Sequence, residues 1–200
     1  FKDITEKAKA LAGETYQRPA QAPDFLRNLS YADYQSIRFN PDQSLWRSGG
    51  SRFQVMMIPQ GSFYTNAVQL NVIDSEGARP IGFDKSRFDY PSPELAKRIP
   101  ADLGYAGFKL TYPLSDKGVQ KQFLVFGGAS YFRGVGASQN FGLSGRGIAV
   151  DTGLPSGEEF PAFTEFWMEH PKADSDFMVV YGLLDGPSLT GAYRFEIHPG

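Results

Sequence analysis

The stretch LPSGEEFPAFTEFWMEH, residues 154–170, decides between a helical and a β fold. As a helix, it would begin with an SGEE capping box and carry Phe163, Phe166, Trp167 and His170 on one apolar stripe. As a strand, it would divide into two faces, with Phe160, Ala162, Thr164, Phe166 and Met168 in the core and Glu159, Pro161, Phe163, Glu165, Trp167 and Glu169 on the opposite side. We predict the strand, because proline, threonine and aromatic residues are weak helix formers and the flanking segments have the length of strands.

Strand-like segments also make up most of the remaining chain. FQVMMIP (53–59) and AVQLNVID (67–74) alternate between two faces, and the residues expected in the core are Phe53, Val55, Met57, Val68, Leu70 and Val72. Turn residues separate further segments of strand length, namely GFKLTYPL (107–114), KQFLVFGGASYF (121–132), GIAVDT (147–152), DFMVVYGLLD (176–185) and AYRFEIH (192–198). Short strands spaced in this way predict an all-β fold, a large antiparallel β-sandwich.

Helical signals are confined to short segments. DITEKAKALAG (3–13) predicts a short N-terminal helix, with Asp3 and Glu6 spaced like a capping box and Gly13 as its end. SYADYQS (30–36) and SPELAKRIP (92–100) each predict a turn or two of helix.

Composition excludes several classes of function. The 200 residues are 41% hydrophobic and 21% charged, which is typical of one folded domain without a transmembrane segment. A net charge of -2 argues against nucleic acid or anionic lipid as partners. The absence of cysteine excludes thiolate catalysis and cysteine-bound zinc, and His170 and His198 lack neighbours at metal-ligand spacing. We therefore expect no metal and no cofactor.

A glycine-rich stretch is the best candidate for a binding site. Nine of the 22 glycines fall between Gly127 and Gly157, which predicts long loops rather than a helix. These loops carry aromatic, amide, guanidinium and carboxylate groups, on Tyr131, Arg133, Gln139, Asn140, Arg146 and Asp151. Such groups suit sugar recognition, since a pyranose offers hydroxyls for hydrogen bonds and an apolar face for an aromatic ring.

Several of these residues have structural alternatives. Glu165 and Glu169 could belong to a solvated sheet face, and Trp167 could pack in the core instead of stacking on a ligand. Glu158 and Glu159 follow the Pro-Ser-Gly turn and could either have a structural role at that turn or bind a ligand.

The other candidates also allow two interpretations. Tyr131 and Phe132 are consecutive at a strand end, so one of the two must face outward. Arg146 and Asp151 could form an ion pair with each other across a loop instead of binding a ligand.

Four long motifs resemble one known family over essentially the whole chain. They are LGYAGFKLTYPL (103–114), GASYFRGVGASQNFGLSGRGIAVDT (128–152), LPSGEEFPAFTEFWMEHP (154–171) and YGLLDGPSLTGAYRFEIHPG (181–200). Together they resemble the periplasmic glucan biosynthesis protein G and D family, also called the MdoG, OpgG or OpgD family. The resemblance implies a periplasmic protein exported through a signal peptide, and the start at Phe1 without a methionine fits a processed or trimmed chain.

The resemblance also implies a domain arrangement. Family members have a mutarotase-like supersandwich with a long glucan groove, followed by an immunoglobulin-like domain. We expect residues 1–200 to form the N-terminal portion of that sandwich, with the immunoglobulin-like domain absent from this chain.

The function implied by the resemblance is the biosynthesis or remodelling of osmoregulated periplasmic glucans with a β-1,2-linked backbone. The activity would be that of an inverting β-1,2-glucanase or a transglycosylase; the alternative is a non-catalytic glucan-binding or assembly protein of the same pathway, with other glucan-biosynthesis proteins as partners. The catalytic carboxylates are expected outside residues 1–200, so no catalytic residue is assigned here. The expected substrate-binding residues are Tyr131, Arg133, Arg146, Asp151, Glu158, Glu159 and Trp167.

Overall fold

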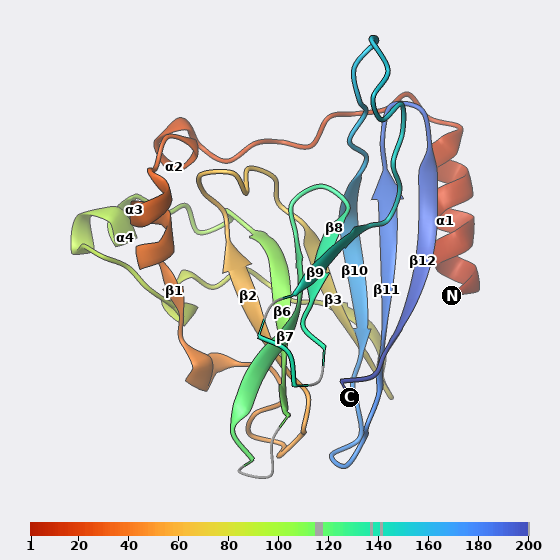
Figure 1. The fold of residues 1–200 in the computed structure, drawn as a ribbon. Coiled ribbons are helices and arrows are strands. Elements are labelled where there is room, and N and C mark those ends of the chain that lie inside the picture. Colours follow the sequence, from red (N-terminus) through yellow and green to blue (C-terminus); the bar gives the residue numbers. More distant parts are fainter. Residues whose placement is uncertain (115–117, 137, 141, 200) are drawn as a thin grey trace.

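The chain folds into two facing β-sheets with short helices at their margins (Figure 1). The computed structural model describes residues 1–114, 118–136, 138–140 and 142–199. Within these residues the strands are β1 (Arg38–Phe39), β2 (Gln54–Pro59), β3 (Gln69–Asp74), β4 (Gly77–Pro80), β5 (Phe88–Asp89), β6 (Tyr105–Pro113), β7 (Gln120–Gly127), β8 (Tyr131–Gly134), β9 (Leu143–Arg146), β10 (Ala162–Glu169), β11 (Met178–Asp185) and β12 (Thr190–Ile197). The helices are α1 (Lys2–Ala12), α2 (Asp24–Arg27), α3 (Tyr31–Ser36) and α4 (Pro93–Arg98).

The strand pairing confirms the predicted β-sandwich. In the described part of the chain, one five-stranded sheet has the order β12-β11-β10-β3-β4 and the other β2-β6-β7-β8-β9, while β1 and β5 form a separate pair. Neighbouring strands run antiparallel, except that β3 and β10 run parallel. The first sheet is therefore mixed, because β3 and β10 are far apart in the sequence and are not joined by a hairpin.

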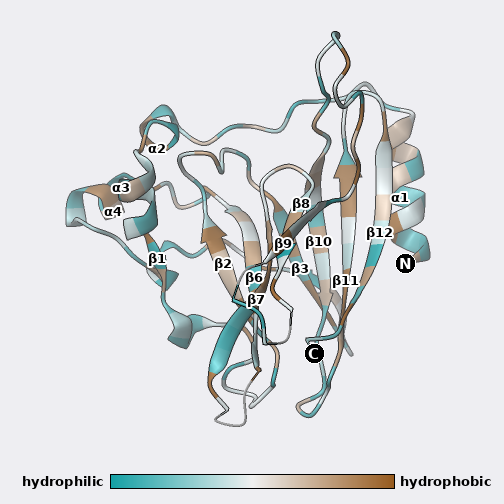
Figure 2. Ribbon diagram, viewed as in Figure 1, coloured by the Kyte–Doolittle hydropathy of each residue, from teal (hydrophilic) through white to brown (hydrophobic). Residues whose placement is uncertain are grey.

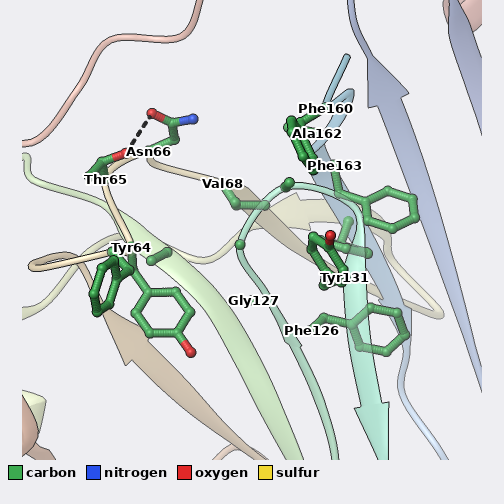
Figure 3. A pocket seen from close by; sticks show the side chains of 15 residues that line it. Tyr64, Thr65, Asn66, Val68, Phe126, Gly127, Tyr131, Phe160, Ala162 and Phe163 are labelled. Carbon is green, nitrogen blue, oxygen red and sulfur yellow. Dashed lines mark hydrogen bonds between the residues drawn. The ribbon is translucent and has the colours of Figure 1, made fainter. Parts of the chain in front are cut away.

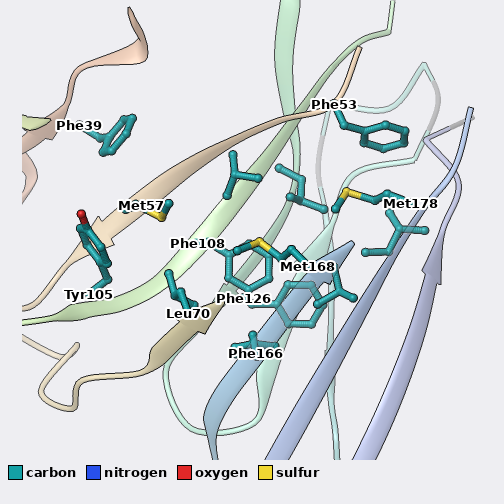
Figure 4. Close-up of a cluster of buried hydrophobic side chains, with 14 of the residues drawn as sticks. Phe39, Phe53, Met57, Leu70, Tyr105, Phe108, Phe126, Phe166, Met168 and Met178 are labelled. Carbon is teal, nitrogen blue, oxygen red and sulfur yellow. The ribbon is translucent and has the colours of Figure 1, made fainter. Parts of the chain in front are cut away.

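A cluster of aromatic rings joins the two sheets (Figure 4). Phe126 of β7 stacks on Phe108 of β6 at 5.0 Å between ring centroids. Across the sandwich, the Phe126 ring meets Phe166 at 5.3 Å and Phe195 at 5.0 Å, both edge to face. Edge-to-face pairs add favourable quadrupole interactions to the burial of large apolar surfaces, so this cluster holds the sheets together.

The alternating segments place their side chains as expected. Phe53, Val55, Met57 and Leu70 are buried in the core between the sheets. In Figure 2, strands β2 and β11 carry strongly hydrophobic segments, whereas the loops at the strand ends are mostly teal or white. The alternation of apolar and polar residues thus identified the buried faces of β2 and β3 correctly.

The predicted strand in residues 154–170 exists, but its faces are not those expected. A register shift between Phe163 and Glu165 in β10 places an extra residue, Thr164, opposite β11. Phe163 therefore turns into the core beside Phe166, although simple alternation placed it on the opposite face. A β-bulge interrupts the period of two, and neighbouring side chains then share a face.

The face that alternates acids with aromatics is covered by α1. Glu165 accepts a hydrogen bond from Asn71 at 2.9 Å and pairs with Lys7 of α1. Glu169 accepts a hydrogen bond from the Tyr181 hydroxyl. These acids are therefore half-buried and bound to neighbouring side chains, and they do not form an open solvated face.

Helices α1, α3 and α4 form where predicted, with one difference in capping, whereas the short α2 (Asp24–Arg27) was not predicted. Ser30 accepts from the Asp33 amide at 3.1 Å, and Ser92 accepts from the Leu95 amide at 3.2 Å, which starts α3 and α4. Helix α1 begins at Lys2, and its N-cap residue Phe1 makes no side-chain cap, so the proposed Asp3–Glu6 capping box was wrong. Asp3 instead lies in the first turn, where its charge favours the helix dipole.

The glycine-rich stretch contains more strand than predicted. It forms the hairpin of β8 and β9, although positions 137 and 141 lie outside the described residues. Residues 147–152, expected as a strand, instead form a loop that pairs only through a bridge between Val150 and Glu159. Edge pairing with β8 extends the sheet into the glycine-rich region, which local composition does not reveal.

Replacement of Phe126 by alanine should strongly destabilise the fold. The buried ring contacts both sheets, and phenylalanine-to-alanine changes in cores cost about 3–5 kcal/mol. Chemical denaturation followed by near-ultraviolet circular dichroism measures this loss. Leu143→Ala, at an exposed position of β9, is the control and should change stability by less than about 0.5 kcal/mol. Similar losses for the two variants would show that Phe126 does not hold the sheets together.

Candidate functional site

An aromatic cleft opens where the ends of β7 and β10 approach the loop before β3 (Figure 3). Its volume is ≈ 260 Å³. It is lined by Phe63, Tyr64, Thr65, Asn66, Val68, Ala106, Phe126, Gly127, Gly128, Ala129, Tyr131, Phe160, Ala162, Phe163 and Phe166. Buried rings of the sandwich core form its floor, so the cleft is continuous with the packing that joins the sheets.

Three rings on the cleft wall are exposed to solvent. Phe63 is 81% exposed, Phe160 55% and Tyr131 38%. Exposed aromatic rings around a concave surface are typical of binding sites, because a ligand that covers these rings removes apolar surface from water, which is favourable in free energy. Thr65 and Asn66, in the same segment as Phe63 and across the cleft from Phe160 and Tyr131, add hydroxyl and amide groups, and Thr65 Oγ1 lies 3.4 Å from Asn66 Oδ1.

The loop that carries Phe63 is held by backbone contacts. The Gly61 and Tyr64 backbones exchange two hydrogen bonds of 2.9 Å, and the Ser62 amide donates to Leu26 O at 2.9 Å. The Tyr34 hydroxyl donates to Pro59 O at 2.9 Å just before this turn. The exposed Phe63 ring is thus presented by a well-anchored turn.

A polar cluster lies beside Tyr131. Arg146 is directly opposite Tyr131 in the β8–β9 hairpin, with its guanidinium 5.6 Å from the tyrosine ring centroid. The same guanidinium forms an ion pair with Glu158 and lies 3.3 Å from the Thr152 hydroxyl. The hydrogen bond that Arg146 donates to Glu158 raises the pKa of Arg146 above its ordinary value.

This cluster brings together several predicted site residues. Tyr131, Arg133 and Arg146 share the outward face of the hairpin, since Tyr131 and Arg133 are two residues apart on β8. Phe132 turns into the core, so Tyr131 is the outward residue of that pair. Arg146 pairs with Glu158 and not with Asp151, which corrects the alternative of an Arg146–Asp151 ion pair.

The remaining predicted residues lie elsewhere. Asp151 is exposed in the loop after β9, with a left-handed backbone (φ 56°). Glu159 accepts from the Ser188 amide at 3.1 Å, which ties it to the turn between β11 and β12. Trp167 is on the opposite face of β10, half-buried beneath α1, with Lys7 Nζ 5.2 Å from its ring. Trp167 is therefore separated from the cleft by the thickness of its own sheet.

A buried carboxyl group lies next to Glu159. Asp185, at the end of β11, is opposite Ala162 of the cleft and accepts a hydrogen bond from the Gly186 amide at 3.0 Å. Burial raises the pKa of Asp185, and the charge of Glu14 raises it further, while the Gly186 hydrogen bond opposes the change. The charges of Asp185 and Glu159 in turn contribute to a raised pKa of the Tyr16 phenol, whose main cause is burial.

Sequence reasoning missed several residues that line the cleft. Phe63, Tyr64, Thr65, Asn66 and Phe160 were not expected in a site, although SFYTN (62–66) follows a Pro-Gln-Gly turn and has two adjacent aromatics. Two adjacent aromatic residues at such a turn indicate a possible binding surface, because one of the two rings is hard to bury. The sequence does not reveal that this turn lies close to residues about 65 to 100 positions later in the chain.

The described residues carry no cluster of three or more histidine, cysteine, aspartate or glutamate side chains placed to hold a metal ion. None of the helices in the described ranges has both the length and the apolar character needed to cross a membrane.

Comparison with known families identifies the chain. The family described as "Periplasmic glucan biosynthesis protein, MdoG" matches residues 1–200. The chain belongs to the MdoG family. Among similar MdoG-family proteins, glucans biosynthesis protein G of Pseudomonas paraeruginosa is 44% identical over 99% of this chain, and that of Ralstonia nicotianae is 45% identical over the same share.

The match covers only part of these relatives. The aligned region is 38% of the Pseudomonas paraeruginosa protein and 40% of the Ralstonia nicotianae protein. Glucans biosynthesis protein G of Dickeya dadantii, 43% identical, is likewise covered over 38% of its length. The chain thus spans about two fifths of the MdoG-family proteins that it matches.

The Arg146–Glu158 ion pair should order the loop of residues 147–159. Arg146→Gln and Glu158→Gln each remove the pair, so the loop amides of Leu154, Gly157 and Glu159 should exchange with solvent several-fold faster. Hydrogen exchange measured by NMR or mass spectrometry follows this change. The double variant should be little worse than either single variant, because both remove the same interaction.

Arg194→Gln is the matched control for this experiment. Arg194 pairs with Glu196 two residues away within β12, so its loss should leave exchange in loop 147–159 unchanged. Unaltered exchange in both Arg146→Gln and Glu158→Gln would contradict an ordering role for the pair.

Asp185→Asn should stabilise the protein near neutral pH. A carboxyl whose folded-state pKa is raised contributes stability that is present below its unfolded pKa and is lost as the pH rises through the folded value. The amide removes the buried charge and keeps an oxygen for the Gly186 hydrogen bond. Melting temperatures should therefore be higher in the variant at pH 7, with the difference vanishing below about pH 3.8, the ordinary aspartate value.

Asp176→Asn, at an exposed position before β11, provides the comparison. It removes the same charge without relieving burial, so no pH-dependent gain is expected. A gain in Asp176→Asn equal to that in Asp185→Asn would assign the effect to net charge.

Proposed function

We propose that this chain forms a carbohydrate-binding wall of a protein of periplasmic glucan biosynthesis. The observation that carries the proposal is the cleft with three solvent-exposed aromatic rings, on Phe63, Tyr131 and Phe160. Exposed rings can stack on the apolar faces of successive pyranoses, while the Arg146–Glu158–Thr152 cluster and Asn66 supply hydrogen-bonding edges for hydroxyls. Membership of the MdoG family and similarity to glucans biosynthesis protein G support a glucan as the sugar.

The finer proposal concerns the glucan and the compartment. We propose that the ligand is the β-1,2-linked backbone of osmoregulated periplasmic glucans, and that the protein is exported to the periplasm through a signal peptide and works with other glucan-biosynthesis proteins. The family resemblance and the description of the matching family support this proposal. No cofactor is required for binding through rings and hydrogen bonds.

The residues of the cleft support binding more directly than bond cleavage. None of the described residues that line it is acidic. Inverting hydrolysis requires two carboxyl groups, typically about 6.5–9.5 Å apart, around the glycosidic bond. If the protein cleaves glucan as an inverting β-1,2-glucanase or transfers it as a transglycosylase, we propose that its catalytic carboxylates come from outside residues 1–200.

A non-catalytic role is the second candidate, and the same observation favours it. A cleft rich in aromatic rings, with no acid among its described lining residues, suits a protein that holds a growing glucan for partner enzymes. The two candidates differ in whether the glucan is shortened.

For the domain arrangement, we propose that residues 1–200 are the N-terminal portion of a larger supersandwich. The partial coverage of the relatives supports this arrangement. The remainder of the groove and an immunoglobulin-like domain would then come from other parts of the intact protein.

The intact protein should be incubated with purified linear β-1,2-glucan while reducing ends, product lengths and the anomer formed are followed. Shorter oligosaccharides with inverted anomers would establish the hydrolase. Saturable binding without cleavage would establish the carrier role, and neither binding nor cleavage would contradict the proposed ligand.

Tyr131→Ala should weaken glucan binding by roughly tenfold. A sugar that covers roughly 55 Å² of the ring gains about 1.4 kcal/mol at ~25 cal/mol per Å² of apolar surface, which corresponds to a factor of about ten in affinity. Isothermal titration calorimetry of the intact protein with β-1,2-glucan measures the change. Phe177→Ala is the control, because Phe177 is also an exposed aromatic but stacks on His198 away from the cleft. Equal losses in the two variants would exclude the cleft as the binding site.

A further inference from the structure

A second cavity lies on the outer face of the β2–β6–β7 sheet, beneath α3 and β1. Its volume is ≈ 530 Å³. It is lined by Tyr31, Tyr34, Gln35, Ile37, Arg38, Phe39, Met56, Met57, Ile58, Pro59, Tyr64, Lys109 and Val125. The cavity adjoins the aromatic cleft at Tyr64, which lines both.

Lys109 is the unusual residue of this cavity. It lies in the middle of β6, with the apolar Met56 and Val125 directly opposite on the neighbouring strands. Its neighbours in sequence, Phe108 and Leu110, are in the core, so Lys109 points to the outer face. An ammonium group between apolar neighbours loses hydration, and burial alone lowers the pKa of Lys109.

The charges around Lys109 do not balance. The described lining residues include two cations, Lys109 and Arg38, and no acid. Two acids belong to the elements of this region: Asp33 of α3, which accepts a hydrogen bond from the Ser30 hydroxyl at 2.6 Å, and Asp89, which is opposite Arg38 across the β1–β5 pair. Neither lines the cavity. A partly buried cation without a counter-ion is costly, and an anionic ligand would relieve that cost.

Tyrosine rings form the other part of the wall. Tyr34 and Tyr64 stack with ring centroids 5.5 Å apart, and the Tyr34 hydroxyl is held by Pro59 O. Tyr31, on the preceding turn of α3, is 56% exposed at the same cavity. These rings offer flat apolar surface next to the cations, which suits a ligand that has both a ring and a charge.

We propose that this cavity binds a small organic anion, a ring that bears a phosphate or carboxylate group, with Lys109 and Arg38 contacting the anion and Tyr31 and Tyr64 contacting the ring. The site is separate from the neutral-sugar cleft and goes beyond the proposed function. Its recognition depends on charge, whereas the cleft depends on exposed rings and neutral hydrogen bonds.

The test uses the intact protein, labelled with [13C]lysine, and three probes: glucose 6-phosphate, glucose and inorganic phosphate. Glucose 6-phosphate should shift the Lys109 signal saturably and raise the pH at which Lys109 titrates, because a bound anion stabilises the ammonium. Glucose should leave this signal unchanged, and inorganic phosphate should bind at least tenfold more weakly than glucose 6-phosphate. The Lys109 signal is assigned as the peak that is present in the wild-type spectrum and missing from the spectra of Lys109→Met and Lys109→Arg.

Lys109→Met keeps the length and apolar stem of the side chain and should weaken glucose 6-phosphate binding at least tenfold in calorimetry. Lys97→Met removes an exposed lysine of α4 and should leave the affinity unchanged. Melting temperatures establish that both variants are folded.

No shift of the Lys109 signal with glucose 6-phosphate, or equal affinity in Lys109→Met and wild type, would overturn the proposal. Equal binding of inorganic phosphate and glucose 6-phosphate would overturn the part assigned to the tyrosines. Because β-1,2-glucan is neutral, a negative result with glucose 6-phosphate leaves the glucan-binding test of the cleft unaffected. A negative result with glucan likewise leaves the test of the outer cavity unaffected.

Discussion

Packing of Phe126 between the two sheets is the contact on which the rest of the structure depends. Its ring meets Phe108 in its own sheet and Phe166 and Phe195 in the other. Two sheets bury their apolar faces only when rings from both interdigitate at the spacing of a sandwich core. This contact fixes the separation of the sheets and places the ends of β7 and β10 beside each other, where the aromatic cleft opens.

The cleft shows how a binding surface can extend from a core. The same segments provide buried rings for the floor, such as Phe163, and exposed rings for the wall, such as Phe160. The β8–β9 hairpin adds Tyr131 on its outward face while Phe132 faces inward. Because side chains alternate along a strand, one hairpin contributes Phe132 to the core and Tyr131 to the binding surface.

Charge distinguishes the two cavities. Beside the cleft, Arg146 is neutralised by Glu158, so the polar groups there suit hydroxyls of an uncharged sugar. In the outer cavity, Lys109 and Arg38 face no acid among the described lining residues. The two cavities adjoin at Tyr64 and differ in the charge of the residues that line them.

The sequence by itself determined the fold class, the buried faces of β2 and β3 and the positions of α1, α3 and α4. These features follow from local periodicity and from capping residues such as Ser30 and Ser92, which act within a few residues of chain. The motifs of residues 103–200 also carried the family resemblance, because ordered agreement over long stretches needs no knowledge of contacts.

Only the tertiary structure decided how the site is assembled. The bulge at Thr164 turned Phe163 inward, because strand register is set by pairing with β11 and not by residue preference. The partner of Arg146 proved to be Glu158 and not Asp151, and Phe63 and Phe160 came to line one cleft, because the packing of the sheets brings distant loops together. Lys109 shares a cavity with residues of α3, which local sequence did not indicate. Such juxtapositions depend on contacts between residues far apart in the chain, about which local sequence carries little information.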